Sequence, residues 1–260
     1  MRAVTVTRYV TPLREGGSLP AIVEADDDGM YVLKFRGAGQ GPKVLVAELI
    51  AGEIGRALGL RVPEIVFAEL DAEFARTEPD EEIQHLIRES AGLNLGLDYL
   101  PGSVTFDPVV DGIDAELASS IVWFDAFTSN VDRTPRNTNM LIWHRHLWLI
   151  DHGASLYFHH GEDRFRHRSG DPFPLIKGHV LLAEAAELEE IDERMTHRIT
   201  PDIVEEIVAG VPEEWLERDA EDPDRPRAAD QRTQYVAYLL ERLKRPHRFV
   251  EEAVRARAAL

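Results

Sequence analysis

The pattern of apolar and polar positions divides the chain into a strand-rich beginning and a helical remainder. Short segments rich in apolar and β-branched residues are expected to be strands, at residues 4–10, 21–23, 30–35, 63–70 and 93–100. Asp27-Asp28-Gly29 predicts a hairpin turn between the second and third of them. Apolar residues at helical spacing predict a helix over residues 45–58, which Gly59 ends. A polar helix is expected over residues 79–90.

Beyond residue 105 the pattern turns helical. Helices are expected at residues 113–128, 180–217 and 229–260. Two short apolar runs, residues 140–143 and 147–150, lie on either side of His144-Arg145-His146 and predict a hairpin. The chain is therefore expected to have an α+β fold of two lobes. Residues 1–100 would form a small β-rich N-terminal lobe with one main helix, and residues 101–260 a larger, mostly helical C-terminal lobe.

Composition narrows the classes of function. The chain has 260 residues and a net charge of −18, which repels phosphate backbones and makes nucleic-acid binding unexpected. It has no cysteine, which excludes disulfides and thiolate chemistry. It shows neither a signal peptide nor an apolar run of the roughly 20 residues that span a membrane, so a cytoplasmic protein without membrane contact is expected. Residues 184–224 hold 16 acidic residues and 3 arginines, a pattern typical of a solvated surface. As a binding surface, this segment would favour a basic partner.

The spacing of three oxygen-bearing side chains points to phosphate chemistry. Asp132 and Asn137 are five residues apart, and Asp151 follows the predicted hairpin. Phosphoryl transfer from ATP needs a carboxylate beside the acceptor and oxygen ligands for Mg²⁺. The loop would present Asp132 to the acceptor and Asn137 to the metal. The hairpin would return Asp151 to the same edge.

The N-terminal part supplies groups that suit phosphate binding. Lys34 lies in the strand Tyr31-Val32-Leu33-Lys34-Phe35, between apolar neighbours, where an unpaired ammonium is costly. A nucleotide phosphate and a helix carboxylate would satisfy it. The Gly16-Gly17-Ser18 turn joins two predicted strands, and its backbone N–H groups could cover phosphates.

These segments, in this order, resemble the HipA-like kinases, which belong to the wider protein-kinase-like and phosphatidylinositol-kinase-like group. The resemblance covers roughly residues 14–157: the Gly-rich hairpin, YVLKF, the segment VAELIAGEIGRALGLRVPE, DRTPRN and LIDHG. It implies a bilobal kinase fold with ATP between the lobes. Lys34 would hold the α- and β-phosphates, Asp132 would be the catalytic aspartate, and Asn137 and Asp151 would bind Mg²⁺.

The sequence departs from related kinases in two places. His152-Gly153 follows the metal-binding Asp151, where ordinary protein kinases have Phe-Gly, and no His-Arg precedes Asp132. The chain is also shorter than the bacterial toxin kinases, whose substrate is therefore not carried over.

The partner of Lys34 on the helix has two candidates. At 100° per residue, Glu53 falls inside the apolar arc of the helix, whereas Glu48 falls beside Gly52 and Gly55. The distance to the Gly-Leu-x-Val-Pro tail favours Glu48 as the acidic position of the family. Glu53 would then pair with an arginine.

The adenine site is expected where the first lobe ends. The strand at residues 93–100 should lead into a hinge, with backbone groups of Asp98, Tyr99 and Leu100 at the adenine edge. The apolar side chains of Ile22 and Val32 should pack on the ring.

The resemblance implies an ATP- and Mg²⁺-dependent kinase that phosphorylates a protein Ser or Thr. A small molecule or a lipid headgroup is the alternative acceptor. Autophosphorylation is open, with Ser18 as the candidate. Two alternatives are a non-catalytic nucleotide-binding regulator and a His/Asp metal-dependent phosphohydrolase. The second rests on six histidines between residues 144 and 167: His144, His146, His152, His159, His160 and His167. Turnover with and without Mg²⁺ separates the three functions.

Overall fold

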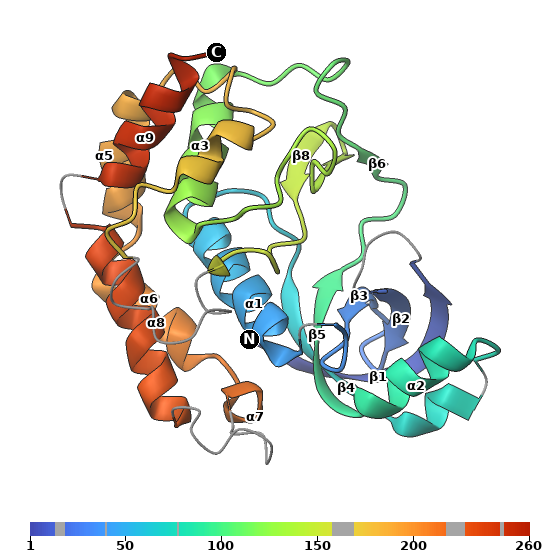
Figure 1. Cartoon of the computed structure of the whole chain (residues 1–260). Coiled ribbons are helices and arrows are strands. Elements are labelled where there is room, and N and C mark those ends of the chain that lie inside the picture. Colours follow the sequence, from blue (N-terminus) through green and yellow to red (C-terminus); the bar gives the residue numbers. More distant parts are fainter. Residues whose placement is uncertain (14–18, 40, 77, 158–168, 217–226, 245–246) are drawn as a thin grey trace.

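A strand barrel and a helical layer lie on opposite sides of one central helix, α1 (Figure 1). The computed structural model describes residues 1–13, 19–39, 41–76, 78–157, 169–216, 227–244 and 247–260. Within these ranges, no helix is both long and apolar enough to cross a membrane.

The N-terminal part is a closed barrel in the strand order β1-β2-β3-β5-β4. Its strands are β1 (Ala3–Pro12), β2 (Ala21–Ala25), β3 (Met30–Lys34), β4 (Ile65–Leu70) and β5 (Gly92–Asp98). The predicted turn at residues 27–29 joins β2 to β3, which pair antiparallel. Parallel pairing of β1 with β4 closes the barrel, with Val4 opposite Ala68. Closure leaves no open edge at β1 or β4, which protects both strands from pairing with other chains.

The barrel has its own hydrophobic core. Val4 and Val6 of β1 are buried between exposed threonines, as expected for a strand with one face inside. Tyr31 and Leu33 of β3 fill the same interior. The helix α2 (Glu81–Glu89), which Asp80 caps through the Glu82 N–H, adds apolar residues to this core together with the 3-10 helix η1 (Ala72–Arg76).

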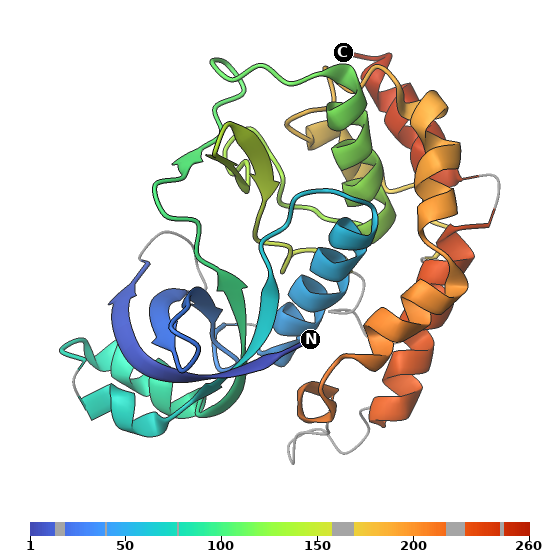
Figure 2. The ribbon, with the colours of Figure 1, turned by 180° about the vertical axis from the view of Figure 1, so that it is seen from behind.

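Helix α1 (Pro42–Ala57) packs into a second and larger core, which it shares with the C-terminal helices. Leu49, Ile50 and Ile54 belong to this core, as do Leu95 and Leu97 on the outer face of β5. Figure 2 shows α1 from behind, between the barrel and the helical layer. The helix therefore contacts both parts of the molecule and shares its core with the C-terminal helices.

The C-terminal part combines a small sheet with helices. The sheet contains β6 (Val104–Thr105), β7 (Met140–Trp143) and β8 (His146–Leu149) in that order. The helices are α3 (Ala115–Thr128), α5 (Leu188–Arg198), α6 (Pro201–Ala209), α7 (Glu213–Leu216), α8 (Ala228–Arg242) and α9 (Arg248–Arg257), with the 3-10 helix η3 (Pro174–Gly178). Asp114 caps α3 by accepting the Leu117 N–H at 2.8 Å.

The short helix α7 attaches the helical layer to the barrel. Trp215 is fully buried, donates its indole N–H to the Leu93 carbonyl at 3.1 Å and meets the Phe67 ring edge-on at 5.7 Å between centroids. Beside it, Arg36 pairs with Glu214 at 3.1 Å. A residue of the C-terminal part thus completes the outer surface of β4 and β5.

Most predicted elements are present, with shifted boundaries. Helix α1 begins at Pro42, ahead of the predicted start at residue 45, because the first turn of a helix tolerates proline. The helix expected over residues 180–217 is wrong as one unit. Residues 180–187 form turns, and Pro201 and Pro212 separate the helices that follow. The predicted boundary at residue 100 falls between β5 and β6.

The contact made by Trp215 gives a first prediction. Trp215→Ala removes a buried aromatic side chain and should lower the free energy of unfolding by about 3–5 kcal/mol. Trp215→Phe keeps a ring against Phe67 but loses the bond to the Leu93 carbonyl, so it should cost less. Urea unfolding of the two variants and the wild type measures both effects. A loss below about 1 kcal/mol for Trp215→Ala would show that α7 is not needed to hold the barrel.

Candidate active site

Lys34 emerges from the barrel toward α1 because of its position on β3. Tyr31 and Leu33 point into the barrel core, so the alternating residues Val32 and Lys34 lie on the outer face. The Lys34 Nζ lies 2.7 Å from Asp151 Oδ1 and 3.7 Å from Glu48 Oε2. Burial opposes the charge of Lys34, but the two carboxylates hold its pKa above the ordinary value. The residue is therefore a buried ammonium with two acidic partners.

Glu48 is the carboxylate of α1 that approaches Lys34. Its side chain is buried, with Oε2 toward Lys34 and Oε1 accepting the backbone N–H of His152 at 3.0 Å. Glu53, the other candidate, is partly exposed and pairs with Arg56 at 3.3 Å. One carboxylate thus links the barrel lysine to the segment that follows β8.

Asp151 stands directly after the β7–β8 hairpin in a strained backbone conformation. Its φ is 55°, in the left-handed region that non-glycine residues avoid. Burial would raise the pKa of its carboxyl, but the neighbouring Lys34 ammonium holds that pKa below the ordinary value. The side chain is still 41% exposed, so the ionised carboxylate remains accessible to a ligand.

Gly153 allows α1 to approach this segment closely. A Cβ at this position would lie 2.6 Å from Cγ1 of Val44 and 3.5 Å from Glu48 Oε2. The first of these distances is a clash with a side chain that cannot easily bend away. The absence of a side chain at Gly153 therefore permits the contact between Glu48 and the backbone after Asp151.

Asp132 is held by the amides of two asparagines. Its Oδ2 accepts Nδ2 of Asn137 at 2.7 Å and Nδ2 of Asn139 at 3.3 Å. A carboxylate can only accept, so Asn137 must turn its NH₂ group toward Asp132. The Oδ1 atom of Asn137 then points away from Asp132, and the exposed side chain can offer it to a cation.

The backbone of this loop is tied to the residue before Asp151. The Asn139 carbonyl accepts the Ile150 N–H at 3.0 Å and a guanidinium N–H of Arg133 at 2.5 Å. A backbone hydrogen bond therefore joins the loop that carries Asp132 and Asn137 to the segment that carries Asp151. The structure thus brings Lys34, Glu48 and Asp151 together, and it ties the loop that carries Asp132 and Asn137 to the residue before Asp151.

A fully buried carboxylate, Asp125 of α3, binds side chains of the loop around Asp132 from the interior of the protein. It accepts Nε of Arg133 at 2.5 Å, Nδ2 of Asn130 at 2.9 Å and Nε2 of His179 at 2.9 Å. The Leu181 N–H donates to Nδ1 of His179, so the imidazole proton is on Nε2 and points at Asp125. Burial opposes ionisation, but the Arg133 charge holds the pKa of Asp125 well below its ordinary value.

Sequence reasoning assigned no role to Asp125, Arg133, His179 or Asn139. One signal was available for Asp125, because a single carboxylate interrupts the apolar helix segment IVWFDAF. A carboxylate at such a position needs a buried partner. Nothing in the sequence identifies His179 as one of those partners, since it comes 54 residues later and outside any motif.

The donor set fits Mg²⁺ bound together with a phosphate group. Mg²⁺ prefers oxygen ligands and usually takes one or two from the protein, with waters and substrate phosphates completing its shell. Asp151 and Asn137 supply such oxygens. In the described ranges, no group of three or more His, Cys, Asp and Glu side chains has the spacing of a metal site. The carboxylates of Asp132, Asp151 and Glu48 outnumber the one ammonium among them, so a divalent cation would find a negative field.

The residues predicted for the nucleotide are divided between described and undescribed parts. Ile22 and Val32 are directly opposite each other on β2 and β3, on the face of Lys34. In the predicted hinge, the Tyr99 N–H already donates to the Met30 carbonyl at 3.0 Å, and the Leu100 carbonyl accepts the Ser103 N–H at 3.2 Å. Asp98 ends β5, and burial raises the pKa of its carboxyl. The predicted phosphate-covering residues Gly16, Gly17 and Ser18 lie outside the described residues.

The histidines that favoured a hydrolase lie in different environments. His144 and His146 are exposed at the tip of the β7–β8 hairpin. His152 is completely buried, and burial lowers its pKa. The remaining three, His159, His160 and His167, lie outside the described residues. The described histidines therefore do not share one site.

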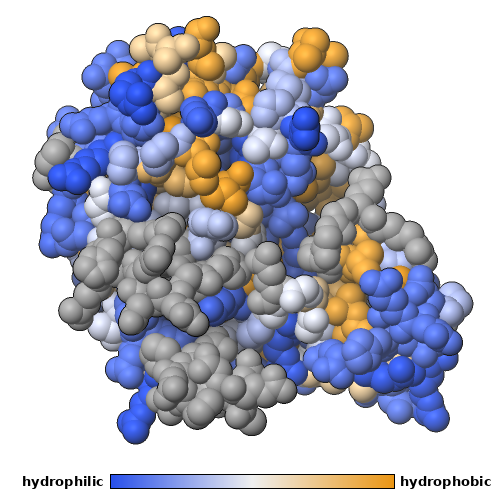
Figure 3. Space-filling model, in the orientation of Figure 1, coloured by the Kyte–Doolittle hydropathy of each residue, from blue (hydrophilic) through white to orange (hydrophobic). Residues whose placement is uncertain are grey.

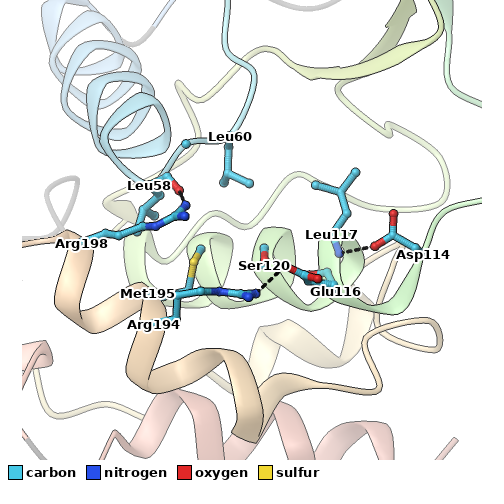
Figure 4. A pocket seen from close by; sticks show the side chains of 10 residues that line it. Leu58, Leu60, Asp114, Glu116, Leu117, Ser120, Arg194, Met195 and Arg198 are labelled. Atoms are coloured by element: carbon cyan, nitrogen blue, oxygen red, sulfur yellow. Dashed lines mark hydrogen bonds and ion pairs between the residues drawn. The ribbon is translucent and has the colours of Figure 1, made fainter.

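A cavity of about 300 Å³ lies away from these residues, where the C-terminal end of α1 meets α3 and α5 (Figure 4). Both arginines in its lining already have partners. Arg194 pairs with Glu116 at 2.8 Å, and Arg198 donates to the Leu58 carbonyl at the end of α1. The cavity therefore marks a second point at which the helical layer holds α1.

Comparisons with known proteins bear on the family and the fold. A family model described as HipA-like kinase matches residues 6–251. A crystal structure of the Helicobacter pylori proinflammatory kinase CtkA is similar, with a TM-score of 0.56 and 12% identity over 99% of this chain and 98% of that one. A crystal structure of the Golgi casein kinase with Mn and ADP bound has a TM-score of 0.51 and 12% identity over 98% of this chain and 73% of that one. No curated protein sequence matches. These likenesses confirm the predicted kinase-like fold.

The buried network around Asp125 gives a second prediction. Asp125→Asn leaves the Arg133 charge unpaired in the interior and should lower the free energy of unfolding by about 3–5 kcal/mol near neutral pH. The folded-state pKa of Asp125 lies below its unfolded value. Its contribution is therefore fully present above the unfolded pKa of about 4 and is lost as the pH falls further.

Urea unfolding between neutral pH and about pH 3 measures this effect. The difference between wild type and Asp125→Asn should stay constant down to about pH 4 and shrink below it. Asp114→Asn is the control, because asparagine caps a helix as well as aspartate does. A difference that does not change with pH would contradict an ionised Asp125.

Proposed function

The chain belongs to the HipA-like kinase family, and we propose that it transfers the γ-phosphoryl group of ATP to a Ser or Thr hydroxyl of a protein. The observation that carries the proposal is the meeting of Lys34, Glu48 and Asp151 from three separate elements. Lys34 and Asp151 are 117 residues apart in the sequence. An ammonium next to an accessible carboxylate is the pair of charges that a metal-bound polyphosphate requires.

Lys34 would bind the α- and β-phosphates. Its flexible side chain is held in place by Glu48, which a buried helix keeps at a fixed distance. The same carboxylate binds the His152 N–H, so Lys34 is positioned relative to the segment of Asp151. Glu48 touches no phosphate in this scheme and is a positioning residue.

Asp132 would orient the acceptor hydroxyl and accept its proton. Two amide donors fix the carboxylate through one oxygen, Oδ2, which leaves Oδ1 for the hydroxyl. Because the transition state of phosphoryl transfer is loose, placing the hydroxyl in line contributes more than removing its proton early.

Asp151 and Asn137 would hold Mg²⁺. An ion held there would supply positive charge to neutralise the phosphate oxygens of ATP. Asp151 would contribute one ionised oxygen, and its exposed side chain allows this without a large movement. Asn137 would contribute Oδ1, since its NH₂ group is already bonded to Asp132. Support for a divalent ion and a nucleotide comes from the Mn and ADP bound to the Golgi casein kinase.

The adenine ring is proposed to lie against Ile22 and Val32, beside Lys34 on the outer face of the barrel. Its edge would meet backbone groups of residues 98–100, other than the Tyr99 N–H and the Leu100 carbonyl, which are already bonded. A protein acceptor is the expectation from the family, and the acidic charge of the chain favours a basic one.

Substitution of Glu48 tests the positioning of Lys34. Glu48→Gln keeps an oxygen for the His152 N–H but removes the charge that faces Lys34. We expect phosphoryl transfer to fall roughly 10²-fold, the cost of misplacing a group at the reacting centre. Glu53→Gln, on the same helix, is the matched control and should keep most of the activity. Equal losses in the two variants would point to a general effect on α1 instead.

Asp132 and Asp151 are separated by comparing binding with turnover. Asp151→Asn removes charge from a proposed ligand of Mg²⁺ and should weaken Mg²⁺-ATP binding and phosphoryl transfer together. Asp132→Asn leaves the metal ligands in place, so nucleotide affinity should change little while transfer falls roughly 10²–10⁴-fold. Calorimetry of Mg²⁺-ATP binding and a transfer assay measure the two effects.

Each other outcome of this comparison has a meaning. Equal loss of nucleotide affinity in both variants would show that the two carboxylates are wrongly assigned. Full activity in Asp132→Asn would remove it from the mechanism. Nucleotide binding by the wild-type chain, without transfer to any acceptor, would favour the regulator.

A further inference from the structure

A short turn between β6 and α3 holds two valines out in water. Val109 is 91% exposed and Val110 is 78% exposed, the highest values among the large hydrophobic side chains of the described residues. The turn stands at the upper right of Figure 1, and the same region of Figure 3 shows hydrophobic colour next to hydrophilic neighbours. Exposing two adjacent valines to water is unfavourable, and covering them would lower the free energy.

Hydrogen bonds within the turn fix these valines in place. The side-chain carboxylate of Asp107 accepts the Val109 N–H at 2.9 Å. The backbone carbonyl of Asp107 accepts the N–H groups of Val110 at 3.1 Å and Asp111 at 2.8 Å. The Asp111 carboxylate in turn accepts the Asp107 N–H at 2.8 Å. The turn is therefore organised before any partner binds, which lowers the entropy cost of binding.

The base of the turn lies beside the candidate active site. The Phe106 N–H donates to the Met140 carbonyl at 3.0 Å, and the Phe106 carbonyl accepts the Thr138 hydroxyl at 3.3 Å. Thr138 directly follows Asn137, a proposed ligand of Mg²⁺. A protein segment on the turn would therefore lie within reach of the reacting groups.

The chain segment that contains the turn carries charge of one sign. Between Arg88 and Arg133 the sequence has no lysine, arginine or histidine and eight acidic residues. The exposed Arg136, two residues before Thr138, belongs to the neighbouring loop. Asp107, Asp111 and Asp114 flank the valines directly. This combination attracts lysine and arginine and repels acidic chains, nucleic acid and a second copy of this chain at −18.

We propose that the turn at residues 107–111 is the docking point for the protein acceptor, which carries apolar side chains flanked by lysine or arginine near its Ser or Thr. The valines contact the apolar side chains, and the aspartates contact the basic ones. This inference rests on the proposed function and adds the class of acceptor to it.

Binding without catalysis tests the docking point. The probe is a short fluorescent peptide with a Leu-Leu pair, flanking arginines and one serine, and its twin has glutamate at each arginine. The wild-type chain should bind the arginine peptide more tightly than the twin, and added salt should weaken this binding. The double variant Val109→Ser, Val110→Ser should bind it roughly tenfold more weakly.

Two further variants act as comparisons. Val10→Ser changes another exposed valine, on β1 of the barrel, and should not alter binding. Asp111→Asn keeps an acceptor for the Asp107 N–H but removes a charge, so it should weaken binding a few-fold and flatten its dependence on salt. The affinity of the double variant for Mg²⁺-ATP should equal that of the wild type.

Failure of docking and failure of the proposed function have different signatures. Equal binding by the double variant, preference for the glutamate twin, or self-association of the wild type that the double variant loses would each overturn the docking point. If the wild type binds the arginine peptide as expected but transfers no phosphate to it or to other acceptors, docking stands and the kinase proposal fails. If it phosphorylates the peptide equally well with both valines replaced, the kinase stands and docking fails.

Discussion

The burial of one ammonium between two carboxylates is the constraint on which the rest of the structure depends. Lys34 comes from the barrel, Glu48 from the central helix and Asp151 from the end of a hairpin. An unpaired charge at this depth would be costly, and so would either carboxylate without the lysine. The three elements must therefore be placed so that Lys34 Nζ lies 2.7 Å from Asp151 and 3.7 Å from Glu48. That placement requires a left-handed backbone at Asp151 and a glycine at position 153, where a side chain would clash with Val44.

The described residues form two hydrophobic cores, and the site draws on elements of both. The barrel interior is one core, while α1, the outer face of β5 and the C-terminal helices form the other. Glu48 and Asp151 therefore belong to one body, and Lys34 to the other. Trp215 and Arg36 tie the barrel to the helical layer through the Leu93 carbonyl and Glu214. The distance from Lys34 to its two partners therefore depends on how the barrel packs against α1, whereas the distance between Glu48 and the Asp151 segment is set within one core.

The sequence was enough to predict features that follow from neighbouring residues in the chain. Alternation along β3 placed Lys34 on the face opposite Tyr31 and Leu33, and the spacing around DRTPRN and LIDHG predicted a loop and a hairpin. Closure of the barrel by β1 and β4 was not predictable, because parallel pairing across about sixty residues leaves no local signal. Helical periodicity placed Glu48 outside the apolar arc of α1, although its side chain is buried in the structure. The helix is buried almost all round, so its apolar arc does not mark one buried side.

Asp125 explains how the loop can lack the His-Arg pair that precedes the catalytic aspartate in ordinary protein kinases. An arginine and a histidine are both present, but they come from other positions. Arg133 follows Asp132 and turns back into the interior, and His179 arrives from the segment after η3. Both meet on Asp125, whose charge Arg133 balances. The loop is thus anchored to α3 by a buried ion pair and by the Asn130 amide. The carboxylate of Asp132 takes no part in this anchor and bonds to Asn137 and Asn139.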